Sequence, residues 1–149
     1  MLIKLKGGID NNLSLNIVQF VLHLFKTEGK ISQGGLLIFH GLIFSNESNF
    51  IAYMNDVYSI ICDAIVSNED ATVGRIACGL VSDLCNYLEK GMTQYAEEFM
   101  NRLRHVLKGN EYESETKVHA IIAIGDICLA IQEDFAVFID DSMVCLQSA

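Results

Sequence analysis

The sequence predicts an all-α protein built as a superhelix of stacked helix pairs, an α-solenoid. Three observations predict this fold. Apolar residues recur at spacings of three and four along most of the chain. The 149 residues include no Pro, which favours uninterrupted helices. Equivalent residues also recur at intervals of 42 and 43 positions, and a period of about 40–47 residues with two helices per unit is the signature of HEAT repeats.

Paired columns of residues define the repeat. In each unit an aliphatic residue is followed eleven positions later by an aromatic one. The pairs are Leu42 with Tyr53, Leu84 with Tyr95, and Ile127 with Phe138. Asp83-Leu84-Cys85 aligns in the same way with Asp126-Ile127-Cys128. The sequence therefore predicts a HEAT-repeat superhelix of about three and a half helix pairs.

The elements follow in order from this register. A helix at 12–27 is expected because its apolar residues match those of 53–64 at an offset of about 40. The pairs 31–45 with 49–67, 71–89 with 92–108, and 115–132 with 134–147 each contain one aliphatic–aromatic pair of the repeat. Segments with turn chemistry separate these helices, at 45–49, 67–70, Lys90-Gly91 and 109–115.

The domain organisation is a single HEAT-repeat segment over 1–149. It divides into half a repeat at 12–27 and full repeats at 31–67, 71–108 and 115–147. Solenoids need polar caps at their ends, and neither end of this sequence resembles one. We therefore expect a fragment of a longer superhelix.

The charge pattern excludes some partners. There are 19 acidic residues against 10 Lys and Arg, and 17 of the acidic residues lie in 31–149 with only six Lys and Arg. An acidic body is unsuited to binding phosphates and favours a basic protein partner. No apolar run reaches the roughly 18 residues of a membrane span, and no signal peptide is apparent at the N-terminus. Neither nucleic acid nor membrane is expected as a partner.

No motif predicts an enzyme, a metal site or a cofactor. The five Cys residues form no CxxC spacing and are expected to be reduced and mostly buried. The four His residues are scattered, and no phosphate-binding loop is present. Adjacent carboxylates, as in Glu97-Glu98 and Asp140-Asp141, point to different sides of a helix and make poor general acid–base pairs. Asp83 and Asp126 recur at one repeat position, which favours a structural role.

Several strings resemble one known family. Gly79–Cys85, Gly125–Ile131 and Asp134–Ala149 resemble the C-terminal half of the importin-β family, and the order of the flanking helices agrees. The resemblance implies a nuclear transport receptor found in the cytoplasm, in the nucleus and at the nuclear pore. It implies binding to the basic segment of importin-α or a basic cargo on the concave face, to Ran in its GTP form, and to nucleoporin Phe-Gly repeats.

The second helix of each pair is expected to line the concave face. With Tyr53, Tyr95 and Phe138 placed inward, a helical turn of about 100° per residue directs one polar residue of each helix away from the core and places the next one on its flank. The predicted concave binding set is Asn55, Asp56, Asp63, Glu97, Glu98, Asp140 and Asp141. An ordinary solvated acidic face is the alternative interpretation.

The first helices are expected to form a convex groove. Small residues in the middle unit lie between apolar residues of the neighbouring units, leaving shallow dimples for a Phe ring. The predicted groove residues are Leu37, Phe44, Gly79, Ser82, Ile122 and Leu129. Lateral packing of Leu37, Ile122 and Leu129 between adjacent helices is the alternative. A generic HEAT scaffold without a transport role, such as a phosphatase or vesicle-coat scaffold, also remains open as a function.

Overall fold

The structure, a computed structural model, describes residues 10–45 and 50–148, and every regular element in these ranges is helical. The α-helices are α1 (Asn11–Glu28), α2 (Gln33–Ser45), α3 (Met54–Ile65), α4 (Ala71–Leu88), α5 (Thr93–Lys108), α6 (Ser114–Ile131) and α7 (Ile139–Ser148). Short 3₁₀ helices η1 (Phe50–Tyr53), η2 (Glu89–Met92) and η3 (Gln132–Phe138) precede α3, α5 and α7. The predicted all-α fold is confirmed.

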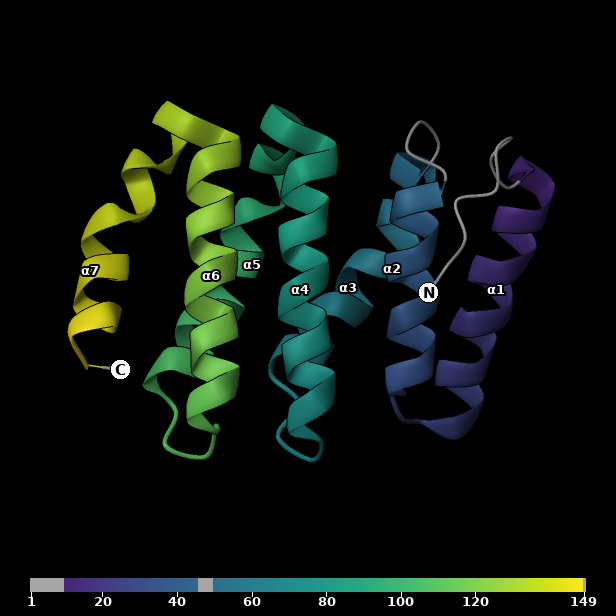
Figure 1. Cartoon of the computed structure of the whole chain (residues 1–149), viewed down its shortest axis with the longest axis horizontal. Helices are drawn as coiled ribbons and strands as arrows, with labels where there is room; N and C mark the ends of the chain where they lie inside the picture. The colour runs from purple at the N-terminus through teal and green to yellow at the C-terminus, as the bar shows by residue number, and fades with distance from the viewer. Residues whose placement is uncertain (1–9, 46–49, 149) are drawn as a thin grey trace.

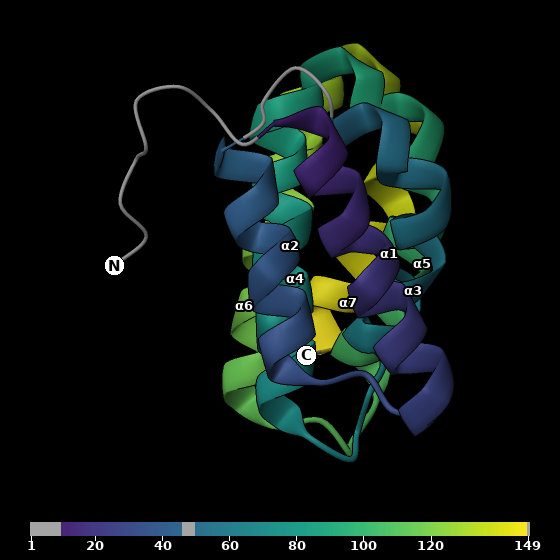
Figure 2. The same cartoon turned by 90° about the vertical axis from the view of Figure 1, so that its right-hand side faces the viewer.

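The helices form two layers. Along the stack in Figure 1, α4 packs against both α2 and α6, and these three helices make the first layer. Helix α5 packs against α3 and α7 in the second layer, and α1 lies on the same side as α3 and α5 when the stack is viewed end-on in Figure 2. Helix α1 is therefore placed like the second helix of a pair, and three first–second pairs follow it.

The start of each second helix differs from the prediction. The expected helices 49–67 and 134–147 begin with the 3₁₀ segments η1 and η3, and regular α-helix starts only at Met54 and Ile139. Two non-glycine residues at these corners have positive φ, Glu89 at 48° and Gln132 at 52°. They are 43 positions apart, so the same strained corner recurs in two repeats. Of the predicted turn at 45–49, Ser45 is the last residue of α2, and 46–49 lie outside the described residues.

Other helix ends have ordinary caps. Gly29 ends α1 in the left-handed conformation at φ 63°, which glycine adopts without steric cost. Asp70 is the N-cap of α4, and one of its side-chain oxygens accepts a hydrogen bond from the Thr72 backbone N–H at 2.9 Å. These caps fix where the chain leaves one layer and enters the other.

The core lies between the two layers. Leu42, Leu84 and Ile127 are all buried there, as their shared repeat position predicts. Tyr95 and Phe138 are only half-buried, because they pack at joints between neighbouring second-layer helices rather than between the layers. None of the helices in the described ranges is both long enough and apolar enough to cross a membrane.

Candidate partner-binding surfaces

The second layer presents the predicted acidic residues on its outer side. Two or more of them lie on each of the helices α3, α5 and α7. Glu98 is half-buried, and the other six are exposed: Asn55, Asp56, Asp63, Glu97, Asp140 and Asp141. We call these seven residues the acidic face. Because its members come from consecutive second-layer helices, the face runs along the stack.

Two carboxylates of this face are already paired with arginines. Glu98 accepts a hydrogen bond from Arg102 Nε at 2.7 Å, one helical turn along α5. Asp141 accepts one from Arg104 Nη1 at 3.0 Å, which joins α5 to α7. The Arg104 side chain is largely buried and lies over the Phe138 ring, so its charge is held in place. These two acidic groups are therefore engaged in structural contacts.

The remaining carboxylates are unpaired. Asp56, Asp63, Glu97 and Asp140 form no ion pair within residues 10–45 and 50–148. Exposed charges of one sign create a negative potential over this side of the molecule. A basic segment could neutralise it without displacing any existing contact.

The sequence could have revealed only one of the two arginine contacts. Glu98 and Arg102 are four positions apart, the spacing at which side chains meet on a helix. Arg104 and Asp141 are 37 positions apart and meet only because neighbouring repeats stack. Their pairing depends on the direction of both side chains, which the repeat length alone does not define.

The predicted groove residues lie on the outer side of the first layer. Leu37 and Phe44 are exposed on α2, and Ile122 and Leu129 on α6, with Leu129 76% exposed. On α4 between them, an added Cβ at Gly79 would meet no atom within 4 Å, so this position faces open space. Ser82 is half-buried. The exposure of the aliphatic residues leaves them accessible to a partner.

A histidine–carboxylate pair joins α2 to α4 within the first layer. His40 Nδ1 lies 2.5 Å from Asp83 Oδ2, and the two side chains form an ion pair when the imidazole is protonated. The His40 ring also packs edge-on against Phe44, with centroids 5.3 Å apart. Burial raises the pKa of Asp83, and Asp126 adds to the rise while His40 opposes it. The two partners are 43 positions apart, one more than the 42-residue step that aligns Leu42 with Leu84, so the repeat aligns His40 with Ser82 and does not by itself predict this contact.

The cysteines take no part in either surface. All five are free thiols, and Cys128 is the one among them that is not buried. Burial raises the pKa of the Cys62 thiol to about 11 and those of Cys78 and Cys85 to about 12. These three thiols remain protonated and unreactive at neutral pH.

Comparisons with known proteins agree on one family. The family described as "Importin subunit beta-1-like, TPR repeats" matches residues 2–149. The importin subunit beta-1 of Arabidopsis thaliana is 32% identical over 114 residues, covering 76% of this chain and 13% of that protein. That of Schizosaccharomyces pombe is 26% identical over 136 residues, covering 89% and 16%. That of Saccharomyces cerevisiae is 29% identical over 80 residues, covering 54% and 9%.

The family description and the observed repeat concern the same kind of architecture. TPR and HEAT repeats are both helix pairs that stack into solenoids, and the 42–43-residue spacing seen here is that of HEAT units. The chain spans less than a fifth of the length of the curated relatives it matches. The match nevertheless covers nearly the whole chain. The chain therefore belongs to the importin subunit beta-1-like family.

Proposed function

We propose that the chain is a segment of a nuclear transport receptor, and that its acidic face binds a basic helical segment. The basic segment of importin-α or of a basic cargo protein has the required chemistry. The observation that most supports this proposal is the row of exposed, unpaired carboxylates at Asp56, Asp63, Glu97 and Asp140. Such a row attracts a cationic partner most strongly at low salt, because salt screens exposed charges.

Charge reversal at two unpaired positions tests the acidic face. The double variant Glu97→Lys/Asp140→Lys leaves the Arg102 and Arg104 contacts intact. It should weaken binding of an arginine-rich helical peptide by about fivefold or more at low salt. The matched control, Glu28→Lys/Glu111→Lys, changes the net charge equally at positions outside the face. Equal weakening by both variants would indicate a non-specific effect of net charge.

We propose in addition that the first-layer groove binds nucleoporin Phe-Gly repeats. The small residues Gly79 and Ser82 lie on α4, between the exposed apolar residues of α2 and α6. Burying a Phe ring there would contribute about 1.5–3 kcal/mol, which suits weak and rapidly exchanging contacts. Replacing Ser82 by Phe should fill the groove and abolish binding of a Phe-Gly peptide. Undiminished binding by Ser82→Phe would place the peptide elsewhere.

Ran binding and localisation are proposed for the whole receptor, of which this chain is a part. The support is the family membership, and no residue of the described chain is assigned to Ran. Pull-down with Ran loaded with GTP or GDP would test the first property. No enzymatic step is included in the proposal. Failure of both the basic and the Phe-Gly peptides to bind would favour the alternative of a scaffold without a transport role.

A further inference from the structure

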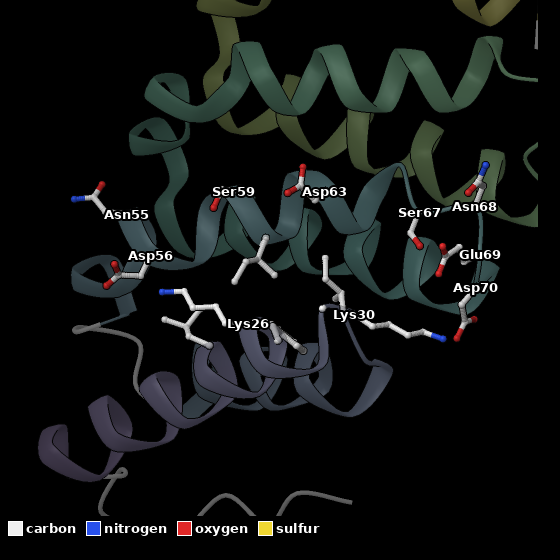
Figure 3. A pocket seen from close by; sticks show the side chains of 15 residues that line it. Lys26, Lys30, Asn55, Asp56, Ser59, Asp63, Ser67, Asn68, Glu69 and Asp70 are labelled. Carbon is white, nitrogen blue, oxygen red and sulfur yellow. The ribbon is translucent and has the colours of Figure 1, made fainter.

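A groove opens between the second-layer helices α1 and α3. Its volume is about 800 Å³, which is within the range of sites that hold small ligands or a few side chains. Figure 3 shows α1 along one side and α3 along the other, with side chains from both directed between them. The apolar part of the lining consists of Leu22, Phe25, Ile31 and Ile60.

The groove exists because α3 presents small polar residues to α1. At the next joint, the Tyr58 ring of α3 fills the space by packing on Tyr95 and Phe99 of α5, with centroids 5.2 and 5.0 Å apart. The residues of α3 that line the groove include Asn55 and Ser59, both exposed. Neither side chain has the bulk of an aromatic ring, so the space between α1 and α3 stays open.

The two sides of the groove have opposite charges. Lys26 of α1 and Lys30, just after the end of α1, line one side. Asp56, Asp63 and Glu69 line the other side from α3 and the segment that follows. None of these five groups forms an ion pair with a residue of the described ranges. Asp70 also lines the groove, but it already accepts hydrogen bonds from Gln33 and the Thr72 N–H. The groove therefore presents an apolar base between a cationic and an anionic edge.

We propose that this groove binds a peptide segment of mixed charge. The segment places a large apolar side chain on the apolar base, basic residues against Asp56 and Asp63, and acidic residues against Lys26 and Lys30. Each charged edge is then neutralised by its complement, and the apolar side chain is removed from water. An all-basic segment fits this groove less well, because the two lysines repel it.

The proposal rests in part on the proposed function, since Asp56 and Asp63 belong to the acidic face. It adds an apolar anchor and acidic residues to the chemistry required of the partner. Lys26 and Lys30 are not in the acidic face, and Glu97 and Asp140 do not line the groove. Variants at Lys26 and Lys30 therefore test the groove, and variants at Glu97 and Asp140 test the acidic face.

Two labelled helical peptides test the proposal on the full chain. Both have the same central leucines. The mixed peptide has arginines along one flank and glutamates along the other, and the basic peptide has arginines along both. Fluorescence anisotropy at low salt gives their affinities for the parent, for Lys26→Glu/Lys30→Glu, and for the matched control Lys108→Glu/Lys117→Glu, whose lysines lie outside the groove.

Reversal at Lys26 and Lys30 should move the two affinities in opposite directions. Binding of the mixed peptide should weaken by about fivefold or more, and binding of the basic peptide should strengthen, with the control within about twofold of the parent for both peptides. A shift of both affinities in the same direction would overturn the proposal. The proposal would also be overturned if the parent bound the mixed peptide no more tightly than Lys26→Glu/Lys30→Glu does.

A space-filling variant gives a second, independent readout. Ser59→Trp places a large ring in the groove from an exposed position, so the fold should tolerate it. It should weaken the mixed peptide by about tenfold or more, because the apolar anchor loses its place. Unchanged binding would overturn the proposal. Self-association of the parent that Ser59→Trp abolishes would identify a second copy of the chain as the occupant, and would also overturn it.

The results also distinguish this proposal from the proposed function. If Glu97→Lys/Asp140→Lys leaves the basic peptide unaffected while Lys26→Glu/Lys30→Glu weakens the mixed peptide, the groove proposal stands and the acidic-face proposal fails. The reverse pattern rejects the groove and retains the acidic face.

Discussion

Gly79 offers a sharp test of how α4 is oriented, because its surroundings predict the sign of a stability change. Gly79 lies inside the helix Ala71–Leu88, and a Cβ added there would meet no atom within 4 Å. Replacement by Ala therefore adds helix propensity without a clash. The expected gain in the free energy of unfolding is about 1 kcal/mol, from the propensity difference and the lower entropy of the unfolded chain.

Gly35 provides the matched control on α2. A Cβ at Gly35 would overlap the Phe25 ring and approach Val21 Cγ1 at 3.2 Å. Phe25 is itself buried and packs edge-on against Phe39, so a shift of its ring would disturb that contact. Gly35→Ala should therefore lower the free energy of unfolding by about 1–3 kcal/mol, the usual cost of overpacking a core.

Urea denaturation followed by far-UV circular dichroism measures both variants. Gly79→Ala should shift the midpoint upward and Gly35→Ala downward, with unchanged slopes. A loss of stability in Gly79→Ala would contradict the prediction, because it would mean that this side of α4 is packed rather than open. If Gly79 faces open space, the larger variant Gly79→Leu should also fold. It should lose Phe-Gly binding while keeping its affinity for a basic peptide.

Three further predictions concern strain, pH and thiol reactivity. Replacing Glu89 or Gln132 by Gly should raise the free energy of unfolding by about 1 kcal/mol in urea titrations, because both residues have positive φ; a loss of stability would contradict this. Burial raises the pKa of Asp83, so the folded state binds its proton more tightly than the unfolded chain does, and stability should fall as pH rises from 3.8 through the folded-state pKa. Asp83→Asn should reduce this fall. A pH profile of thermal unfolding identical to that of the parent would contradict this prediction. Native-state labelling should modify Cys128 before the four buried thiols, and mass spectrometry showing another order would refute the burial pattern.

The repeat register could be predicted from the sequence because its signal is periodic. Leu42, Leu84 and Ile127 were aligned by spacing alone, and all three lie in the core. The corners were not predicted in the same detail. A 3₁₀ segment such as η3 uses residues that also suit an α-helix, and the positive φ at Gln132 is imposed by tertiary packing rather than by residue type.

The outward positions of the candidate surfaces could be predicted, but their contacts could not. Exposure of Leu129 and Glu97 follows from the helical angle measured from the buried column. The contact of Arg104 with Asp141 depends on how two repeats are stacked, and so does the groove beside Ser59. Helix periodicity gives the direction of a residue from its own axis, but it does not define the distance between one helix and the next.

The acidic face can be tested most directly by locating a basic peptide on the chain. An arginine-rich helical peptide would be titrated at low salt into ¹⁵N-labelled protein, and amide chemical shifts would be followed. We predict that the largest changes occur on α3, α5 and α7, around Asp56, Glu97 and Asp140, and that they shrink when salt is added. Changes concentrated on α2, α4 and α6, or changes that persist unaltered at high salt, would contradict it.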